Sequence, residues 1–188
     1  ALSEPVDAVS STDYRSRSYW LDDIVSSGAD LSPRPSLPGA REVDVAIVGA
    51  GYTGLWTAHY LLDHDPTLRI AVLEKEIAGF GASGRNGGWC SALFPASMEK
   101  VAAASSRDAA MALRRAMRNS VDEVGAVVAT QGIDCDYSLG GTLSLIRSRP
   151  QLARAREKLE RARAWGETDD DVCLLGPAEA SARLNATG

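Results

Sequence analysis

The sequence has 188 residues, of which 45% are hydrophobic and 24% charged, with a formal net charge of -5 at pH 7. This composition is ordinary for a globular protein and excludes a disordered, collagen-like or coiled-coil chain. The negative net charge argues against a nucleic-acid-binding protein. No run of about 18 apolar residues predicts a membrane span.

The three cysteines are odd in number and far apart in the sequence: Cys90, Cys135 and Cys173. This spacing is typical of neither a disulfide framework nor a metal site, so we predict no bound metal. It favours a reducing compartment, and we therefore expect a cytoplasmic protein. We also expect Cys90 to be a buried, unreactive thiol.

Residues 1–41 show little periodicity and are interpreted as an N-terminal arm that lies on a larger body. The aromatic residues Tyr14, Tyr19 and Trp20 are expected to anchor this arm by packing. Prolines exclude a regular element in the second part of the arm: Pro33, Pro35 and Pro38.

A strand–helix–strand unit is predicted directly after the arm. Residues 43–48 (VDVAIV) form a β-branched apolar run that is typical of a buried parallel strand. Residues 49–54 are rich in glycine, and apolar residues then recur at helical spacing until Pro66 ends the helix. Residues 69–73 (RIAVL) predict a second buried strand, parallel to the first. Together these segments predict an α/β fold with a Rossmann-like βαβ unit.

The glycines of residues 49–54 (GAGYTG) follow the pattern G-x-G-x-x-G between a strand and a helix. In this pattern Gly49 permits a tight turn, Gly51 permits close approach of a pyrophosphate, and Gly54 permits close packing of the helix on the strand. The start of the helix offers free N–H groups and the positive end of its dipole to phosphates. The motif therefore predicts a dinucleotide site.

Glu74 ends the second strand, 25 residues after Gly49. A carboxylate at this place is expected to accept hydrogen bonds from a ribose diol. It would repel a 2′-phosphate, which disfavours NADP, although the neighbouring Lys75 weakens that repulsion. FAD and NAD both present an ADP half, so these residues leave the choice between them open.

Residues 79–88 (GFGASGRNGG) form a second glycine-rich loop, whose N–H groups can provide a further anion-binding surface. Trp89 either walls the site or fills the core beneath the loop. Beyond it, the pattern predicts one long helix over residues 98–130, a hairpin over 134–147, and helices over the two ranges 150–165 and 177–184.

The long helix presents two different faces. Its apolar stripe consists of Met117, Val121, Val124 and Val128. Its arginines, by contrast, are expected to be solvated or to form ion pairs: Arg107, Arg114 and Arg118.

The sequence VDVAIVGAGYTGLWTAHYLL…VLEKEIAGFGASGRNGG resembles the opening of the D-amino-acid oxidase-like superfamily of FAD-dependent oxidoreductases. Within that group it is most similar to the γ-glutamylputrescine oxidase type. The resemblance implies FAD as cofactor, with its AMP half held by Gly49, Gly51, Gly54 and Glu74. Tyr52, Thr53 and Lys75, which lie beside these residues in the sequence, are also expected to bind the cofactor. The resemblance further implies contacts with the pyrophosphate, ribityl chain and flavin from Ala82, Ser83, Arg85, Asn86, Gly87 and Gly88.

The resemblance implies an enzyme that oxidises a C–N bond of an amine or amino acid, with hydride transfer to the flavin and hydrolysis of the resulting imine. The alternatives are a dinucleotide-binding module without turnover and an NAD-dependent Rossmann protein. Members of the family are about twice as long or more. We therefore expect an N-terminal portion of such an enzyme, which by itself is inactive, binds FAD weakly and self-associates.

The expected domain organisation has three parts. Residues 1–41 form the N-terminal arm, and residues 42–131 form the N-terminal portion of the FAD-binding domain. Residues 132–188 begin an α+β substrate domain that is incomplete within this sequence. The catalytic residues are not assigned, because most of the substrate domain is expected to lie beyond this segment.

Overall fold

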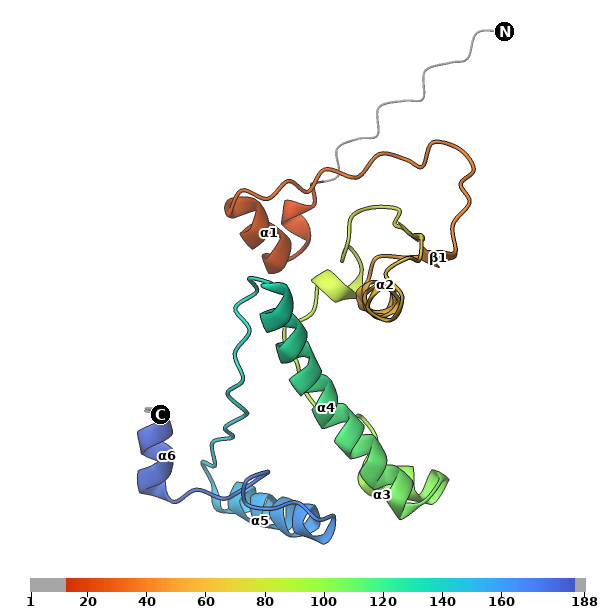
Figure 1. The fold of residues 1–188 in the computed structure, drawn as a ribbon. Helices are drawn as coiled ribbons and strands as arrows, with labels where there is room; N and C mark the ends of the chain where they lie inside the picture. The colour runs from red at the N-terminus through yellow and green to blue at the C-terminus, as the bar shows by residue number, and fades with distance from the viewer. Residues whose placement is uncertain (1–12, 185–188) are drawn as a thin grey trace, which may run out of the picture. The chain divides into compact units, whose positions relative to one another are not determined.

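The computed structural model describes residues 13–184 of the chain (Figure 1). These residues divide into two compact units, with the division between Trp89 and Cys90. Each unit is described by itself. The division concerns compactness only, so the three sequence-based domains stay a prediction.

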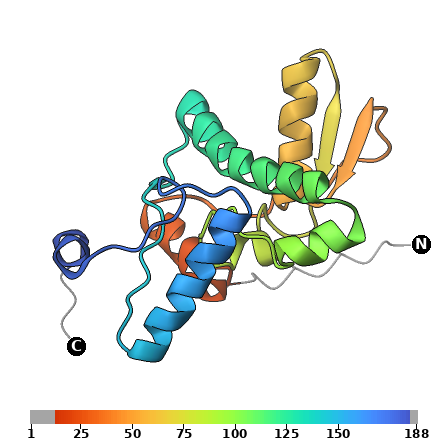
Figure 2. The same cartoon turned by 90° about the horizontal axis from the view of Figure 1, so that it is seen from below.

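The centre of the first unit is a βαβ element made of β1 (Val45–Val48), α2 (Tyr52–His64) and β2 (Ile70–Leu73). The two strands are parallel, as predicted, with Val45 opposite Ile70 and Val48 opposite Leu73. The predicted burial of the strands is wrong, because no residue of either strand is buried. Figure 2 shows both strands side by side with α2 along them. The carboxyl ends of the strands therefore lie together, next to the start of α2.

An ion pair holds the amino ends of the two strands together. The Asp44 carboxylate accepts hydrogen bonds from the backbone N–H of Arg69 at 2.8 Å and from its guanidinium at 2.9 Å. The Asp44 N–H donates to the Arg69 carbonyl at 3.0 Å. These bonds lower the pKa of Asp44 to about 2, chiefly through the Arg69 side chain. The register of the strands is thus fixed from their first residues.

The arm contains two elements that the sequence did not predict, the 3-10 helix η1 (Arg15–Arg17) and the helix α1 (Tyr19–Ser26). Ser18 caps α1, because its Oγ accepts a hydrogen bond from the Leu21 N–H at 3.2 Å. Leu21 and Tyr14 are buried together with Ile77. The expected packing role of Tyr14 is therefore confirmed. No helix or strand forms at the three prolines that follow.

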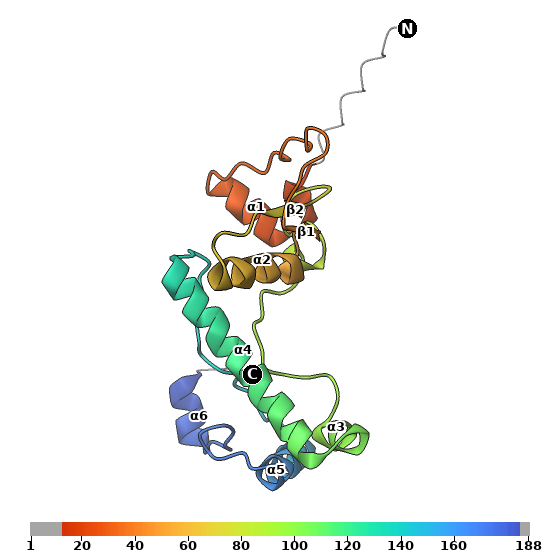
Figure 3. The ribbon, with the colours of Figure 1, turned by 45° about the vertical axis from the view of Figure 1, so that its right-hand side comes forward.

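The second unit begins with α3 (Met98–Ala104) and α4 (Arg107–Gln131), which contact each other (Figure 3). The prediction of one continuous helix over residues 98–130 is wrong. The chain breaks at Ser105 and Ser106, and the Ser106 Oγ caps α4 by accepting from the Ala109 N–H at 3.1 Å. A serine side chain that bonds to the backbone competes with helix continuation, which explains the break.

The last helices of the second unit are α5 (Arg149–Ala164) and α6 (Pro177–Arg183), close to their predicted bounds. The predicted hairpin over residues 134–147 is wrong, because no strand forms there. Instead, the Tyr137 hydroxyl donates to the Val121 carbonyl of α4 at 3.0 Å. A lone two-stranded hairpin is marginally stable, so this contact with the helix decides the local conformation.

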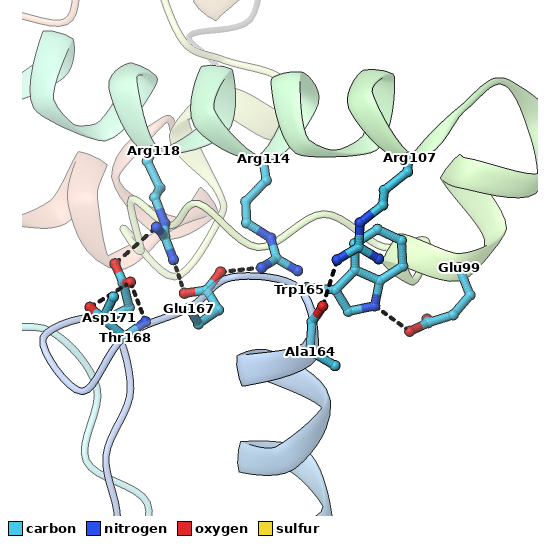
Figure 4. A network of polar contacts seen from close by, with 9 residues as sticks. All are labelled: Glu99, Arg107, Arg114, Arg118, Ala164, Trp165, Glu167, Thr168 and Asp171. Carbon is cyan, nitrogen blue, oxygen red and sulfur yellow. Dashed lines mark hydrogen bonds and ion pairs between the residues drawn. The ribbon is translucent and has the colours of Figure 1, made fainter.

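Ion pairs tie α4 to the segment after α5 (Figure 4). Arg114 and Arg118 both bind the Glu167 carboxylate, whose side chain is 9% exposed. Arg118 also pairs with Asp171 at 2.9 Å. The guanidinium of Arg107 lies 4.3 Å from the centre of the Trp165 ring. The expectation of ion pairs on this face is confirmed for Arg114 and Arg118. Among the described helices, none is long and apolar enough to cross a membrane.

Candidate dinucleotide-binding site

The first glycine motif lies at the carboxyl end of β1 and makes the turn into α2. Gly49 has φ +99°, a conformation that side chains disfavour. A Cβ atom on Gly54 would lie 2.1 Å from the Gly49 carbonyl oxygen and 3.2 Å from Cγ2 of Ile47. Only glycine fits at position 54 without displacement of backbone. The predicted steric roles of Gly49 and Gly54 therefore agree with the geometry.

The N-terminus of α2 is open because Gly51 is its cap residue and brings no side chain. The first N–H groups of a helix have no acceptor within that helix. One of them, on Tyr52, donates to the Ser83 Oγ at 3.0 Å. A Cβ on Gly51 would lie 3.0 Å from the same Oγ. The start of α2 thus meets the second glycine-rich loop, and Thr53 is exposed beside it.

Glu74 lies at the carboxyl end of β2, directly beside the turn of the motif. Its Oε2 accepts from the Ala50 N–H at 2.8 Å, and its Oε1 accepts from the Glu76 N–H at 3.1 Å. The bond from Ala50, followed by that from Glu76, lowers the pKa of Glu74 below its ordinary value. The side chain is exposed and each carboxylate oxygen can accept more than one hydrogen bond. A ribose diol could therefore still bind to it.

The ammonium group of Lys75 pairs with Glu76 rather than with Glu74. Its Nζ lies 4.0 Å from the Glu76 Oε1, and its side chain is 90% exposed. An exposed pair of this kind contributes little. The repulsion that Glu74 exerts on a 2′-phosphate is therefore not cancelled by a contact with Lys75.

The second glycine-rich loop contains the 3-10 helix η2 (Ala82–Gly84) and is organised by the Asn86 side chain. The Asn86 amide donates to the carbonyls of Ser83 at 2.8 Å and Ala82 at 3.3 Å, and to the Tyr52 hydroxyl at 3.2 Å. Its Oδ1 accepts from the Gly88 N–H at 2.7 Å. The structure thus brings both glycine segments together, although about 30 residues separate them in the sequence.

Arg85 and Gly87 complete the loop. The Arg85 guanidinium lies 4.3 Å from the centre of the Phe80 ring, and the Phe80 ring meets Tyr14 edge-on at 5.9 Å. The contact with Phe80 thus keeps the Arg85 guanidinium beside the second glycine-rich loop. A Cβ on Gly87 would touch nothing within 4 Å, so its position is open.

The chain carries a recognisable family signature beyond this geometry. The family model described as FAD dependent oxidoreductase (DAO) matches residues 44–187. The chain belongs to this family of FAD-dependent oxidoreductases. The match includes both glycine segments and Glu74.

Three curated relatives are similar over different lengths. The chain is 31% identical to "Gamma-glutamylputrescine oxidoreductase" of Escherichia coli K12 over 141 residues, which cover 75% of this chain and 32% of the relative. It is 32% identical to "Probable oxidoreductase OrdL" of Haemophilus influenzae over 130 residues, which cover 69% of this chain and 29% of the relative. A protein of the same name from Rhizobium meliloti is 46% identical over 54 residues, or 29% of this chain and 12% of the relative.

The matched region amounts to about a third of the length of the first two curated relatives. No solved structure matches the chain. The cofactor of the family is FAD. The residues of the site fit this cofactor. A helix start capped by Gly51 offers N–H groups to a pyrophosphate, and the ionised Glu74 offers acceptors to a ribose diol.

Two expectations near the loop need correction or completion. Cys90 is exposed, so the expected buried thiol is wrong. Its neighbour Trp89 is 77% exposed and does not fill the core. The sequence also gave no sign that Trp20 contacts the loop, where its Nε1 donates to the Asn86 carbonyl at 2.7 Å.

Metal-binding clusters and cavities elsewhere in the described chain were also compared with this site. Within residues 13–184, no cluster of three or more His, Cys, Asp and Glu residues could hold a metal ion. A hollow of about 460 Å³ in the second unit has a largely apolar lining that includes Phe94, Met98, Leu113 and Trp165. None of the predicted cofactor residues lines this hollow, so we assign it no part in the site.

Proposed function

We propose that the chain forms the FAD-binding part of an oxidoreductase that oxidises a C–N bond of an amine or amino acid. Membership of the FAD-dependent family supports the cofactor and disfavours NAD. The similarity to gamma-glutamylputrescine oxidoreductase supports a small-molecule amine as substrate. When bound, FAD supplies the hydride acceptor, and the protein supplies binding, orientation and exclusion of water.

In this proposal the AMP half of FAD is bound at the carboxyl ends of the two strands. Gly49 and Gly54 form the close turn, and Gly51 leaves room for the pyrophosphate at the start of α2. Glu74 accepts hydrogen bonds from the ribose diol as an ionised carboxylate. Residues 82–88 contact the pyrophosphate from the other side and extend towards the ribityl chain.

The fold and domain proposal follows from the same assignment. Residues 42–131 belong to a Rossmann-like FAD-binding domain preceded by the arm of residues 1–41. Residues 132–188 begin the substrate domain. Because the matched region is about a third of the relatives' length, the activity and substrate of the whole protein are part of this proposal. We also propose a cytoplasmic location.

The observation that carries the proposal is the position of the ionised Glu74 beside an open helix start. We expect the 188-residue chain to bind FAD and 5′-AMP weakly but measurably in titration calorimetry, because it is expected to hold only part of the site, and to bind adenosine 2′,5′-bisphosphate more weakly still. Glu74→Ala removes a charged acceptor, whose hydrogen bonds contribute about 1.5–3 kcal/mol. The affinity for FAD and 5′-AMP should fall by about 10- to 150-fold.

The matched control is Glu42→Ala. Glu42 is also exposed, and within the described chain it makes no hydrogen bond or ion pair. This variant should bind both ligands as the unmodified chain does. Equal affinities of the Glu74→Ala chain and the unmodified chain would refute the ribose assignment, and a chain that binds neither ligand would refute the proposed cofactor site.

A further inference from the structure

Trp20 of α1 lies against the second glycine-rich loop, at Asn86 and Gly88. Its Nε1 donates to the Asn86 carbonyl at 2.7 Å. A Cβ on Gly88 would lie 2.5 Å from Cζ2 and 2.9 Å from Cη2 of the indole. The ring therefore packs directly on the Gly88 backbone, which has φ +68°. A side chain from the arm thus fixes a loop that is 66 residues away in the sequence.

The hydrogen bonds within the loop are exposed, as is the bond from Trp20, so the support from Trp20 comes chiefly from the packing of its ring on Gly88. The hydrogen bonds of the Asn86 side chain within the loop are all solvent-exposed. Water competes for exposed donors and acceptors, so each such bond contributes only modestly. After η2 ends at Gly84, no helix or strand constrains residues 85–88. Glycine also gives the backbone more freedom than any other residue.

The helix that carries Trp20 is itself held firmly within the first unit. Leu21 is 4% exposed in the small core, and Ser18 caps the helix. The Tyr14 hydroxyl donates to the Glu76 Oε2 at 3.0 Å, just before the loop begins. Trp20 itself remains 40% exposed, so its ring is not simply a core side chain. A rigid support therefore presents the indole to the loop.

We propose that Trp20 is a positioning residue for FAD: it fixes the backbone of residues 86–88 for the part of the cofactor beyond the adenosine. This inference rests on the proposed function. It predicts a separation between ligands, because 5′-AMP contacts the βαβ element and Glu74 but does not extend along the loop. Loss of Trp20 should weaken FAD binding and spare 5′-AMP binding.

The test compares two substitutions at position 20 by titration of the 188-residue chain with FAD and 5′-AMP. Trp20→Phe keeps an aromatic ring and loses the Nε1 donor, so FAD affinity should fall by about 2- to 10-fold. Trp20→Ala loses both contacts and should reduce FAD affinity by more than about tenfold. The affinity for 5′-AMP should stay within about twofold in both variants.

Leu21→Ala is the matched structural control on the same helix. It removes a buried side chain, so it should lower the urea midpoint and reduce the affinity for both ligands together. Backbone amide exchange gives a readout without any ligand: the Gly88 N–H, which donates to the Asn86 Oδ1, should exchange faster in Trp20→Ala, whereas α2 should be unchanged.

The outcomes separate the two proposals. If the unmodified chain binds FAD and Trp20→Ala binds it equally well, the positioning role is refuted and the cofactor site stands. If Trp20→Ala loses FAD and 5′-AMP in the same proportion, Trp20 is only a structural residue and the inference is again refuted. If the unmodified chain binds neither ligand, the proposed function fails and this inference fails with it.

Discussion

Gly54→Ala tests the closest contact in the βαβ element. The added Cβ would lie 2.1 Å from the Gly49 carbonyl oxygen, whereas ordinary contacts begin at about 3.4 Å. The Gly49 oxygen is a backbone atom, and the backbone of residue 54 fixes the position of the new Cβ, so neither atom can rotate away. Helix α2 would have to move away from β1 by about an ångström, with Ile47 also 3.2 Å from the new atom.

The expected cost follows from two opposing effects. Overpacking of this kind destabilises by about 1–3 kcal/mol, occasionally more. Alanine is a better helix former than glycine by up to about 1 kcal/mol, which offsets part of that cost. We expect a net loss of about 1–2 kcal/mol, which corresponds to a fall in melting temperature of roughly 2–8 °C for a chain of this size.

The assay is thermal unfolding followed by circular dichroism, with Gly87→Ala as the matched control. A Cβ on Gly87 would meet nothing within 4 Å, and its φ is not positive. That variant should keep the melting temperature of the unmodified chain, because the added methyl group meets no neighbour. If Gly54→Ala melts at the same temperature as Gly87→Ala, the close approach of α2 to β1 is wrong.

Three other predictions concern the cofactor site, the pH response and the sheet edges. Gly51→Val directs a branched side chain towards Ser83 and the pyrophosphate space, so FAD binding should be lost while circular dichroism stays unchanged. Because the pKa of Asp44 is about 2 when folded and 3.8 in its ordinary state, its bond to Arg69 stabilises the fold above about pH 4 and is lost as the pH falls through 2. The difference in urea midpoint between Asp44→Asn and the unmodified chain should therefore shrink between pH 4 and pH 2. Within the described residues the sheet has two strands, each with an unpaired edge, and these edges favour self-association, which a sizing column would detect as early elution.

The βαβ element could be predicted because its signals are local. The run of residues 43–48 is too apolar and too β-branched for a loop, and Pro66 marks the end of the helix. The parallel orientation of the two strands then follows from the connection through one helix. The steric roles of Gly49 and Gly54 could be predicted for the same reason, since the close contacts of Gly54 are with Gly49 and Ile47, within seven residues.

The elements that depend on distant contacts could not be predicted. Tyr137 packs against α4, because a Cβ on Gly125 would lie 2.9 Å from the Tyr137 ring. No local sequence pattern predicts this contact. The break at Ser105 did have a signal, because two adjacent serines favour a helix cap, but the apolar stripe of residues 117–128 lies wholly within α4 and does not reveal the break. The helix in the arm was missed although Ser18 precedes it as a cap, because the surrounding serines and prolines suggested irregular chain.

The meeting of the two glycine segments explains why a glycine can cap α2 without leaving its start unsupported. Gly51 forgoes the side-chain bond that serine or aspartate would make at a cap, which makes room for an anion. Ser83 supplies the acceptor from across the loop, by binding the Tyr52 N–H. Ser83 is therefore not the cap residue of α2, but it accepts a hydrogen bond from the helix start as a capping serine would. This division requires the loop to stay close to the helix start, and Asn86 and Trp20 are the residues that hold it there.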